Sequence, residues 1–424
     1  MPTQVAVTVR ATITPGHAAA LKAWLTELDG SDRRAEVLPF EKVAVHFARF
    51  VVLDDAADLY GEPLPASLMF FCDADGAVYP FLYALADAAA TGLDHAFSHC
   101  EGYPDAPTVH DRVRYLRDRM IKADATYVNT TGRSVRQVQD EARLRDAVEA
   151  IVDEAQGKWS KSSADAVYDG VKQRVGRDPA LEWALKRAKG PGLLVRIREY
   201  AHLVTAVGAV LLLLPLLLVV APIWMVALRL QETRDVPHTD PPDPDHLREL
   251  TDREDLVVQN QFSAVGYLKP GKLRQVTVTS VLWAINVAAR HVFNRGNLAG
   301  VKTIHFARWV FIDEGRRMIF TSNYDGSLEN YMDDFIDKIA WSLNAAFSNG
   351  VGYPRTKWLL FAGAKDEQAF KNYIRLRQIP TQLWYSAYPT LTAANIADNA
   401  ALRAGLARKA PPDAEAARTW ARRL

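Results

Sequence analysis

The longest apolar stretch of the sequence lies near its middle. Leu203 to Leu228 reads LVTAVGAVLLLLPLLLVVAPIWMVAL and contains no charged residue. As a helix rising roughly 1.5 Å per residue it would be about 39 Å long, enough to cross a hydrocarbon core of about 30 Å. The pattern predicts a membrane segment over residues 201–230, with Trp224 as an interfacial anchor.

The way in which this segment enters the membrane has two interpretations. Pro215 and Pro222 interrupt the helical hydrogen bonding and favour a bend. The segment is too short for two full spans, which need about 40 apolar residues. It is therefore either one kinked span or a re-entrant or monotopic insertion with both ends on one face.

The flanks and the N-terminus predict which side is cytoplasmic. Basic residues precede the segment, and the acidic stretch Asp235–Asp245 follows it. This asymmetry places the N-terminal side in the cytoplasm. The first residues, MPTQVAVTVRATI, lack a basic region followed by an apolar stretch, so we expect no cleavable signal peptide.

The alternating apolar segments on either side of the membrane segment repeat each other. Val43–Asp54 reads VAVHFARFVVLD, and Lys302–Asp313 reads KTIHFARWVFID. LMFFCDADG (Leu68–Gly76) aligns with MIFTSNYDG (Met318–Gly326), and the offset of 250 residues then holds to the shared Gly-Tyr-Pro. So many identities in the same order predict two duplicated domains.

Each copy predicts the same order of elements. A strand ends at Pro-Gly, and a helix follows, Ala18–Leu28 or Val276–Phe293. The HFAR strand, a strand ending in Asp-Gly and a long helix come next, the helix being Val78–Phe97 or Leu328–Phe347. A further helix leads to a last strand within Thr126–Gly132 or Gln382–Pro389. The order βαββαβ is that of a ferredoxin-like domain.

The predicted fold class is therefore α+β, with two tandem ferredoxin-like (βαββαβ) repeats flanking a hydrophobic membrane segment. The expected divisions are repeat 1 (1–150), a helical extension (151–200), the membrane segment (201–230), a Pro/Asp-rich linker (231–255) and repeat 2 (256–424).

Packing of the two sheets bears on the membrane topology. A ferredoxin-like sheet carries helices on one face only, and its bare face must be covered. The two copies can cover each other only on the same side of the membrane. We therefore favour the re-entrant or monotopic insertion, with the C-terminal domain on the same face as the N-terminal one. Val276–Phe293 would then lie in the membrane interface or be an ordinary buried helix.

The element order along both halves resembles the dimeric α+β barrel superfamily, in which two such sheets pack face to face. The HFARW and NYDGS strings are similar to those of a set of uncharacterised bacterial membrane-associated proteins. The Asp-Gly turn is similar to that of dye-decolourising peroxidases, which also have tandem ferredoxin-like domains. That resemblance implies haem as a cofactor, although the glycine that begins the peroxidase motif is missing and no proximal histidine context is evident.

The composition of the chain limits the kinds of function and site that we expect. Lys and Arg total 51 against 50 Asp and Glu, a balance that argues against a dedicated nucleic-acid binder. Cys72 and Cys100 cannot build a disulfide framework, and we expect two buried, reduced thiols. His95, His99 and Cys100 have near-helical spacing, but the second copy has Asn349 and Gly350 at the last two positions, so we expect no metal site.

The candidate site residues are those repeated in both copies. Strand alternation places His305 and Arg308 on opposite faces unless a bulge intervenes, and the same parity holds in the first copy. In one interpretation these residues are catalytic, with His305 as the haem ligand. In the other the histidine is a buried structural residue, the arginine pairs with an aspartate, and the aspartate makes a turn. The candidates are His46, Arg49, Asp75, His305, Arg308 and Asp325.

Two functions follow. The first is a membrane-anchored protein whose paired α+β domains bind a lipid, an apolar small molecule or a protein partner. The alternative is a haem-dependent, peroxidase-like oxidoreductase acting on an apolar substrate drawn from the membrane. The bilayer is the partner common to both.

Overall fold

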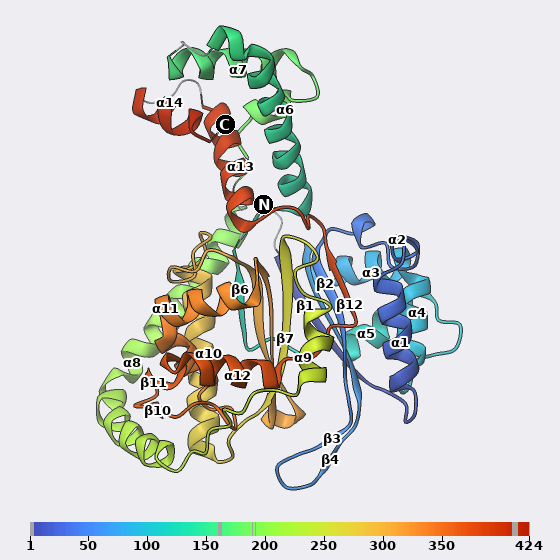
Figure 1. Cartoon of the computed structure of the whole chain (residues 1–424), viewed down its shortest axis with the longest axis vertical. Coiled ribbons are helices and arrows are strands. Elements are labelled where there is room, and N and C mark those ends of the chain that lie inside the picture. The colour runs from blue at the N-terminus through green and yellow to red at the C-terminus, as the bar shows by residue number, and fades with distance from the viewer. Residues whose placement is uncertain are drawn as a thin grey trace.

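The computed structural model describes residues 4–129, 131–159, 163–188, 190, 192–408 and 414–423. Thr130, within a predicted strand, lies outside the described residues, as do 160–162, 189 and 191 of the predicted helical extension. The fold is α+β, with two four-stranded antiparallel sheets that pack face to face. A group of helices lies above them (Figure 1).

The two sheets share one strand order. The first runs β1 (Gln4–Thr12), β5 (Ser67–Asp75), β2 (Val45–Leu53) and β12 (Leu383–Ser386). The second runs β7 (Gln259–Tyr267), β9 (Arg317–Asp325), β8 (Ile304–Ile312) and β6 (Ala125–Val128).

The fourth strand of each sheet comes from the other half of the chain. The order of elements predicts that each half completes its own sheet, and this pairing is wrong. Thr126 of β6 lies opposite Arg308 of the second half, and Trp384 of β12 lies opposite Arg49 of the first. Because β2 and β8 carry nearly the same sequence, either edge offers the same row of backbone groups, and the sequence does not distinguish the two pairings.

Helices cover the outer face of each sheet. The predicted helix Val78–Phe97 is broken at Ala89, and its counterpart Leu328–Phe347 is one helix with non-helical backbone angles at the equivalent Ile339. An apolar residue recurs at every fourth position of this second helix, a pattern that predicts a stripe facing the core. All five side chains of the stripe are buried: Tyr331, Phe335, Ile339, Leu343 and Phe347. The covering helices are α1 (Ala18–Asp29), α2 (Arg34–Val37), α3 (Val78–Ala88), α4 (Ala90–Ser98) and α5 (Val109–Asp118) on the first sheet, and α10 (Lys272–His291), α11 (Leu328–Phe347) and α12 (Glu367–Arg377) on the second.

The inner faces of the two sheets pack on each other. One cluster of buried apolar side chains joins Val51 and Phe71 of the first sheet to Val310 and Ile319 of the second. Each sheet therefore covers the face that the other would otherwise expose to water.

Four helices form a separate group above the sheets (Figure 1). They share a small core that includes Val148, Tyr168, Leu402 and Trp420, so helices from both halves of the chain meet there. They are α6 (Val135–Trp159), α7 (Ala164–Arg177), α13 (Ala393–Leu406) and α14 (Ala414–Ala421).

The connections contain short elements. The predicted linker 231–255 includes α9 (Pro244–Thr251), whose first turn Asp243 caps. The remaining elements are β3 (Ala56–Ala57), β4 (Pro63–Leu64), β10 (Thr356–Lys357), β11 (Phe361–Ala362), η1 (Phe40–Lys42), η2 (Glu182–Leu185), η3 (Asp313–Gly315) and η4 (Gly363–Lys365).

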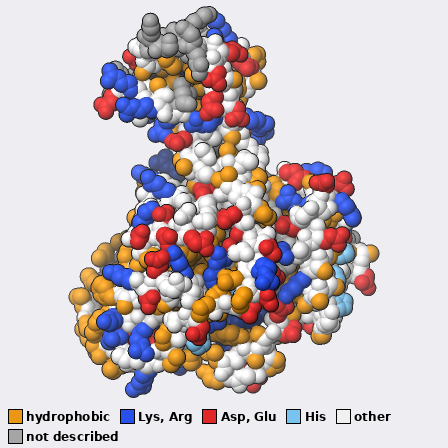
Figure 2. All heavy atoms as spheres, in the orientation of Figure 1, with side chains coloured by type: hydrophobic (Ala, Val, Ile, Leu, Met, Phe, Trp, Pro, Cys, Tyr) orange, Lys and Arg blue, Asp and Glu red, His pale blue; other side chains and the backbone are white. Residues whose placement is uncertain are grey.

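The predicted membrane segment lies within α8 (Leu193–Glu232), a helix of 40 residues that continues through both prolines. In the described part of the chain it is the one helix long and apolar enough to cross a membrane. It is curved and lies beside α10 (Figure 1). Most of its apolar side chains are exposed. Hydrophobic side chains gather over it at the lower left of Figure 2.

Candidate functional site

The repeated histidines lie between the two sheets. The strand pairing shifts at His46 in β2 and at His305 in β8, so each strand has a bulge at its histidine. The bulge turns the ring toward the opposite sheet, where His305 packs 5.5 Å from Phe47 and His46 packs 5.2 Å from Phe306, measured between ring centroids. Strand alternation places histidine and arginine on opposite faces unless a bulge intervenes, and here a bulge does intervene, so both side chains face the other sheet.

The repeated arginines cross from one sheet to the other. The guanidinium of Arg308 donates to the Val7 carbonyl oxygen at 2.7 Å, to Thr8 Oγ1 at 3.0 Å and to the Cys72 carbonyl oxygen at 3.1 Å. It also pairs with the Asp73 carboxylate. All four groups belong to the first sheet, so Arg308 ties the second sheet to the first.

Arg49 makes the mirror-related set of contacts. It donates to the Phe262 carbonyl oxygen at 2.6 Å, to Ser263 Oγ at 3.0 Å and to the Ser322 carbonyl oxygen at 2.9 Å. Its fourth acceptor is the side-chain oxygen of Asn323. The two arginines are therefore related by the duplication in their contacts as well as in their sequence.

One position breaks this symmetry. Asp73 and Asn323 are equivalent in the repeat, yet only the first carries a charge. Burial lowers the pKa of Arg49 to about 9, and the Asp73 carboxylate acts in the opposite direction. Two buried arginines therefore lie near one carboxylate, and that carboxylate pairs with Arg308 and not with Arg49.

Each histidine also meets the aspartate of its own copy. His305 Nε2 lies 2.6 Å from Asp325 Oδ1, and His46 Nε2 lies 3.2 Å from Asp75 Oδ1. Tyr388 adds a hydrogen bond to the His46–Asp75 pair, because its hydroxyl lies 2.8 Å from His46 Nδ1. The histidine–aspartate pairs thus occupy one end of the space between the sheets.

The second oxygen of each aspartate holds a helix of the upper group. Asp75 Oδ2 accepts from the Val135 backbone N–H at 2.9 Å, at the start of α6. Asp325 Oδ2 accepts from the Ala393 N–H at 2.8 Å, at the start of α13. The helix that follows the Asp-Gly turn of copy two is capped instead by Ser327. The aspartates therefore fasten the helices that follow the exchanged strands.

The space around these residues does not fit a haem group. His305 is 1% exposed, and the Phe47 and Tyr388 rings pack against it. The gap bounded by Arg49, Arg308 and their partners has no measurable free volume. The six candidate residues therefore form a filled interior that joins the sheets and helices.

The remaining sequence candidates lie elsewhere. His95 stacks on Trp24, with ring centroids 4.0 Å apart. Cys72 and Cys100 are buried and unbonded to each other, as expected. Within the described ranges, no group of three histidine, cysteine or acidic residues could hold a metal ion.

A cavity that the sequence pattern does not reveal lies on the outer side of the second sheet. It has a volume of about 300 Å³ and lies among the sheet, α10, α11 and α12. Its walls are almost entirely apolar and include Ala288 of α10, Phe335 of α11 and Trp309 of β8. Trp341, which also lines it, is 53% exposed, so the cavity reaches the surface. The small alanines of α10 opposite large aromatic side chains are its only sequence signal.

The apolar helix α8 is attached to α10 near both of its own ends. Between these attachments the apolar middle of α8 points away from the protein. Burial and the neighbouring His202 lower the pKa of His291 at one attachment. The contacts are Arg290–Glu199 at 2.7 Å and His291–His202 at 2.8 Å at the start of α8, and Trp224–Thr277 at 2.9 Å near its end.

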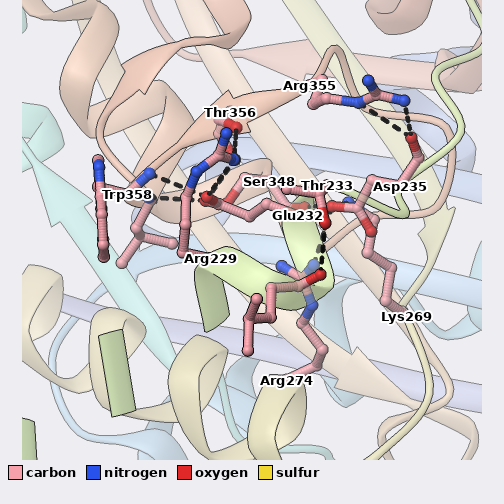
Figure 3. A network of polar contacts seen from close by, with 12 residues as sticks. Arg229, Glu232, Thr233, Asp235, Lys269, Arg274, Ser348, Arg355, Thr356 and Trp358 are labelled. Carbon is pink, nitrogen blue, oxygen red and sulfur yellow. Dashed lines mark hydrogen bonds and ion pairs between the residues drawn. The ribbon is translucent and has the colours of Figure 1, made fainter. Parts of the chain in front are cut away.

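A polar network holds the last turn of α8 against the wall of the apolar cavity (Figure 3). Glu232 is fully buried and accepts from Thr356 Oγ1 at 2.8 Å, the Trp358 N–H at 2.9 Å and the Leu359 N–H at 2.7 Å. Trp358 and Leu359 have φ values of 55° and 64°, so the carboxylate holds a left-handed turn. Because Leu359 lines the cavity, α8 and the cavity wall are directly linked.

No family model matches the chain, and no curated protein matches it. Its function therefore has to be inferred from the geometry. That geometry offers a filled polar interior suited to holding domains together, and an apolar cavity suited to binding an apolar molecule.

Proposed function

We propose that the protein is a membrane-anchored binding protein that holds a lipid chain or another apolar small molecule in the cavity of its C-terminal half. The single observation that carries this proposal is the apolar cavity whose wall, at Leu359, is bonded to the last turn of α8. An apolar cavity beside a membrane helix gives an apolar molecule a short route from bilayer to protein.

The membrane attachment is a monotopic one. Both attachments of α8 are to the same helix, α10, and the apolar middle of α8 faces outward. Exposing so many leucines and valines to water would be costly, at about 25 cal/mol per Å² of apolar surface. The curved helix α8 therefore inserts into one leaflet of the bilayer, and both halves of the chain stay on the cytoplasmic face. Basic residues in the first turns of α8, Arg196 and Arg198, would meet anionic headgroups there.

The paired domains act as the rigid support of this site. Their strand order and face-to-face packing support a relationship to tandem ferredoxin-like domains of the dimeric α+β barrel type. The repeated geometry of Arg49 and Arg308, and of His46 and His305, then serves to hold the two domains together. The haem-dependent alternative gains no support, because the space around His305 is filled.

A plug in the cavity tests this function. Ala288→Phe places a ring in the cavity, and Val287→Phe places the same ring on the neighbouring position of α10, which does not line it. The full chain in detergent is titrated with a dansyl-labelled fatty acid, and energy transfer from tryptophan is recorded.

We expect saturable binding to the unmodified protein and to Val287→Phe, and at least tenfold weaker binding to Ala288→Phe. Circular dichroism checks that each variant is folded. Equal binding to a folded Ala288→Phe variant would contradict the proposal, and absence of binding to all three would favour a protein partner.

A further inference from the structure

A second pocket, with both polar and apolar walls, lies beside the first turns of α10. It has a volume of about 200 Å³ and is separate in its lining from the apolar cavity. Lys269, Arg274 and Asn349 line it, together with the loop that contains Gly315. Neither the fold nor the proposed function uses this pocket.

Two buried side chains in its wall have unused hydrogen-bonding atoms. Arg274 is 2% exposed, and its Nη2 donates to Asp235 Oδ2 at 2.9 Å (Figure 3). Its Nη1 has no partner among the described residues. Asn349 is 0% exposed, and neither atom of its amide has a partner within the same part of the chain. A buried polar group left without a partner costs about 1–3 kcal/mol, so both point to a missing ligand.

The start of α10 adds further donors to the same pocket. Gly271 is the N-cap residue, with φ at 105°, and no side chain caps the first turn. An ideal Cβ at this glycine would meet nothing within 4 Å, so the space in front of the helix is open. The free N–H groups and the helix dipole at such an end favour an anion.

The charges around the pocket leave its donors available. Lys269 and Arg274 share the Asp235 carboxylate beneath the pocket (Figure 3). Burial lowers the pKa of Lys269, and its contact with Asp235 opposes that shift. Of the two carboxylates in the wall, Asp58 is already bonded to the Arg316 guanidinium and to two backbone N–H groups, and Glu314 is exposed.

We propose that this pocket binds a phosphate group, held by Arg274 Nη1, Asn349 Nδ2 and the free N–H groups at the start of α10. A phosphate has enough acceptor oxygens to satisfy all three donors at once. Asp235 follows the last turn of α8, so the pocket lies close to the membrane end of the protein. The phosphate is that of a lipid headgroup or a free phosphate. This site does not depend on whether the apolar cavity is occupied.

The test uses the full chain in dodecyl maltoside, which contains no phosphate. Isothermal titration calorimetry measures binding of two probes, inorganic phosphate and glycerophosphoethanolamine. Asn349→Leu removes the amide, and Arg274→Lys keeps the charge beside Asp235 but removes the free Nη1. The matched control is Arg290→Lys at the other end of α10.

We expect the unmodified protein and Arg290→Lys to bind at least one probe, and both pocket variants to bind it at least tenfold more weakly. Binding of inorganic phosphate identifies a free phosphate as the ligand class, and binding of the phosphodiester alone identifies a lipid headgroup. Binding of neither probe, or equal binding by folded Asn349→Leu and Arg274→Lys, overturns the proposal.

Discussion

At the scale of single residues, the two crossing arginines show how a duplication can diverge. Arg49 and Arg308 make equivalent contacts, but only Arg308 pairs with a carboxylate. Removing one member of a buried ion pair leaves the other charge uncompensated, which costs about 3–5 kcal/mol. Removing an arginine whose acceptors are all neutral costs less, about 1–3 kcal/mol.

This asymmetry makes a prediction. Arg308→Met should lower the free energy of unfolding by more than Arg49→Met, because it strands the Asp73 carboxylate between the sheets. Denaturant unfolding of the two variants, followed by tryptophan fluorescence, measures the difference. Equal losses of unfolding free energy in the two variants would show that Asp73 contributes no more to stability than Asn323.

The sequence identifies these residues but not their directions. Repetition of HFAR and of Asp-Gly singles out His46, His305 and their partners. Strict alternation then assigns the histidines to the wrong face, because a bulge adds one residue without a residue type that marks it. The unpaired amide of Asn349 and the cavity around Ala288 depend on contacts between distant segments, so no local pattern predicts them.

At the scale of elements, the exchanged strands join the two halves of the chain. Helix and strand positions follow from periodicity and turn signals, and the stripe from Tyr331 to Phe347 is buried as predicted. The exchange of the last strands cannot be predicted in this way, because β6 and β12 pair with β8 and β2, whose sequences are similar. Sequence periodicity predicts a strand and its buried face, but not which of two similar strands it pairs with.

The exchange predicts that neither half folds alone. A fragment covering 1–188 lacks β12 and the second sheet, and a fragment covering 192–424 lacks β6 and the first. Each would expose an unpaired strand edge and an apolar sheet face. We expect the two fragments to co-purify as a folded pair when expressed together in the presence of detergent.

Each fragment expressed separately should aggregate or lack cooperative unfolding. The measurement is affinity purification through a tag on one fragment, followed by thermal unfolding. Cooperative unfolding of the isolated 1–188 fragment would show that the exchanged strand is dispensable.

At the scale of the whole molecule, the packing of the sheets constrains the membrane topology. The apolar stretch and its prolines are plain in the sequence, whereas the attachment of α8 to α10 near both ends is not. A transmembrane span would place its two ends about 30 Å apart, on opposite faces of the bilayer. The paired sheets and the two attachments instead keep both ends of α8 with one body.

The most direct test of this account is the side on which each end of α8 lies. Lys186→Cys and Asp240→Cys place exposed thiols before and after α8, while Cys72 and Cys100 are buried and give little background. A membrane-impermeant maleimide is applied to sealed right-side-out and inverted vesicles. A one-sided attachment predicts that both positions are labelled in inverted vesicles and that neither is labelled in right-side-out ones. Labelling of the two positions from opposite sides would contradict it and would require a transmembrane α8.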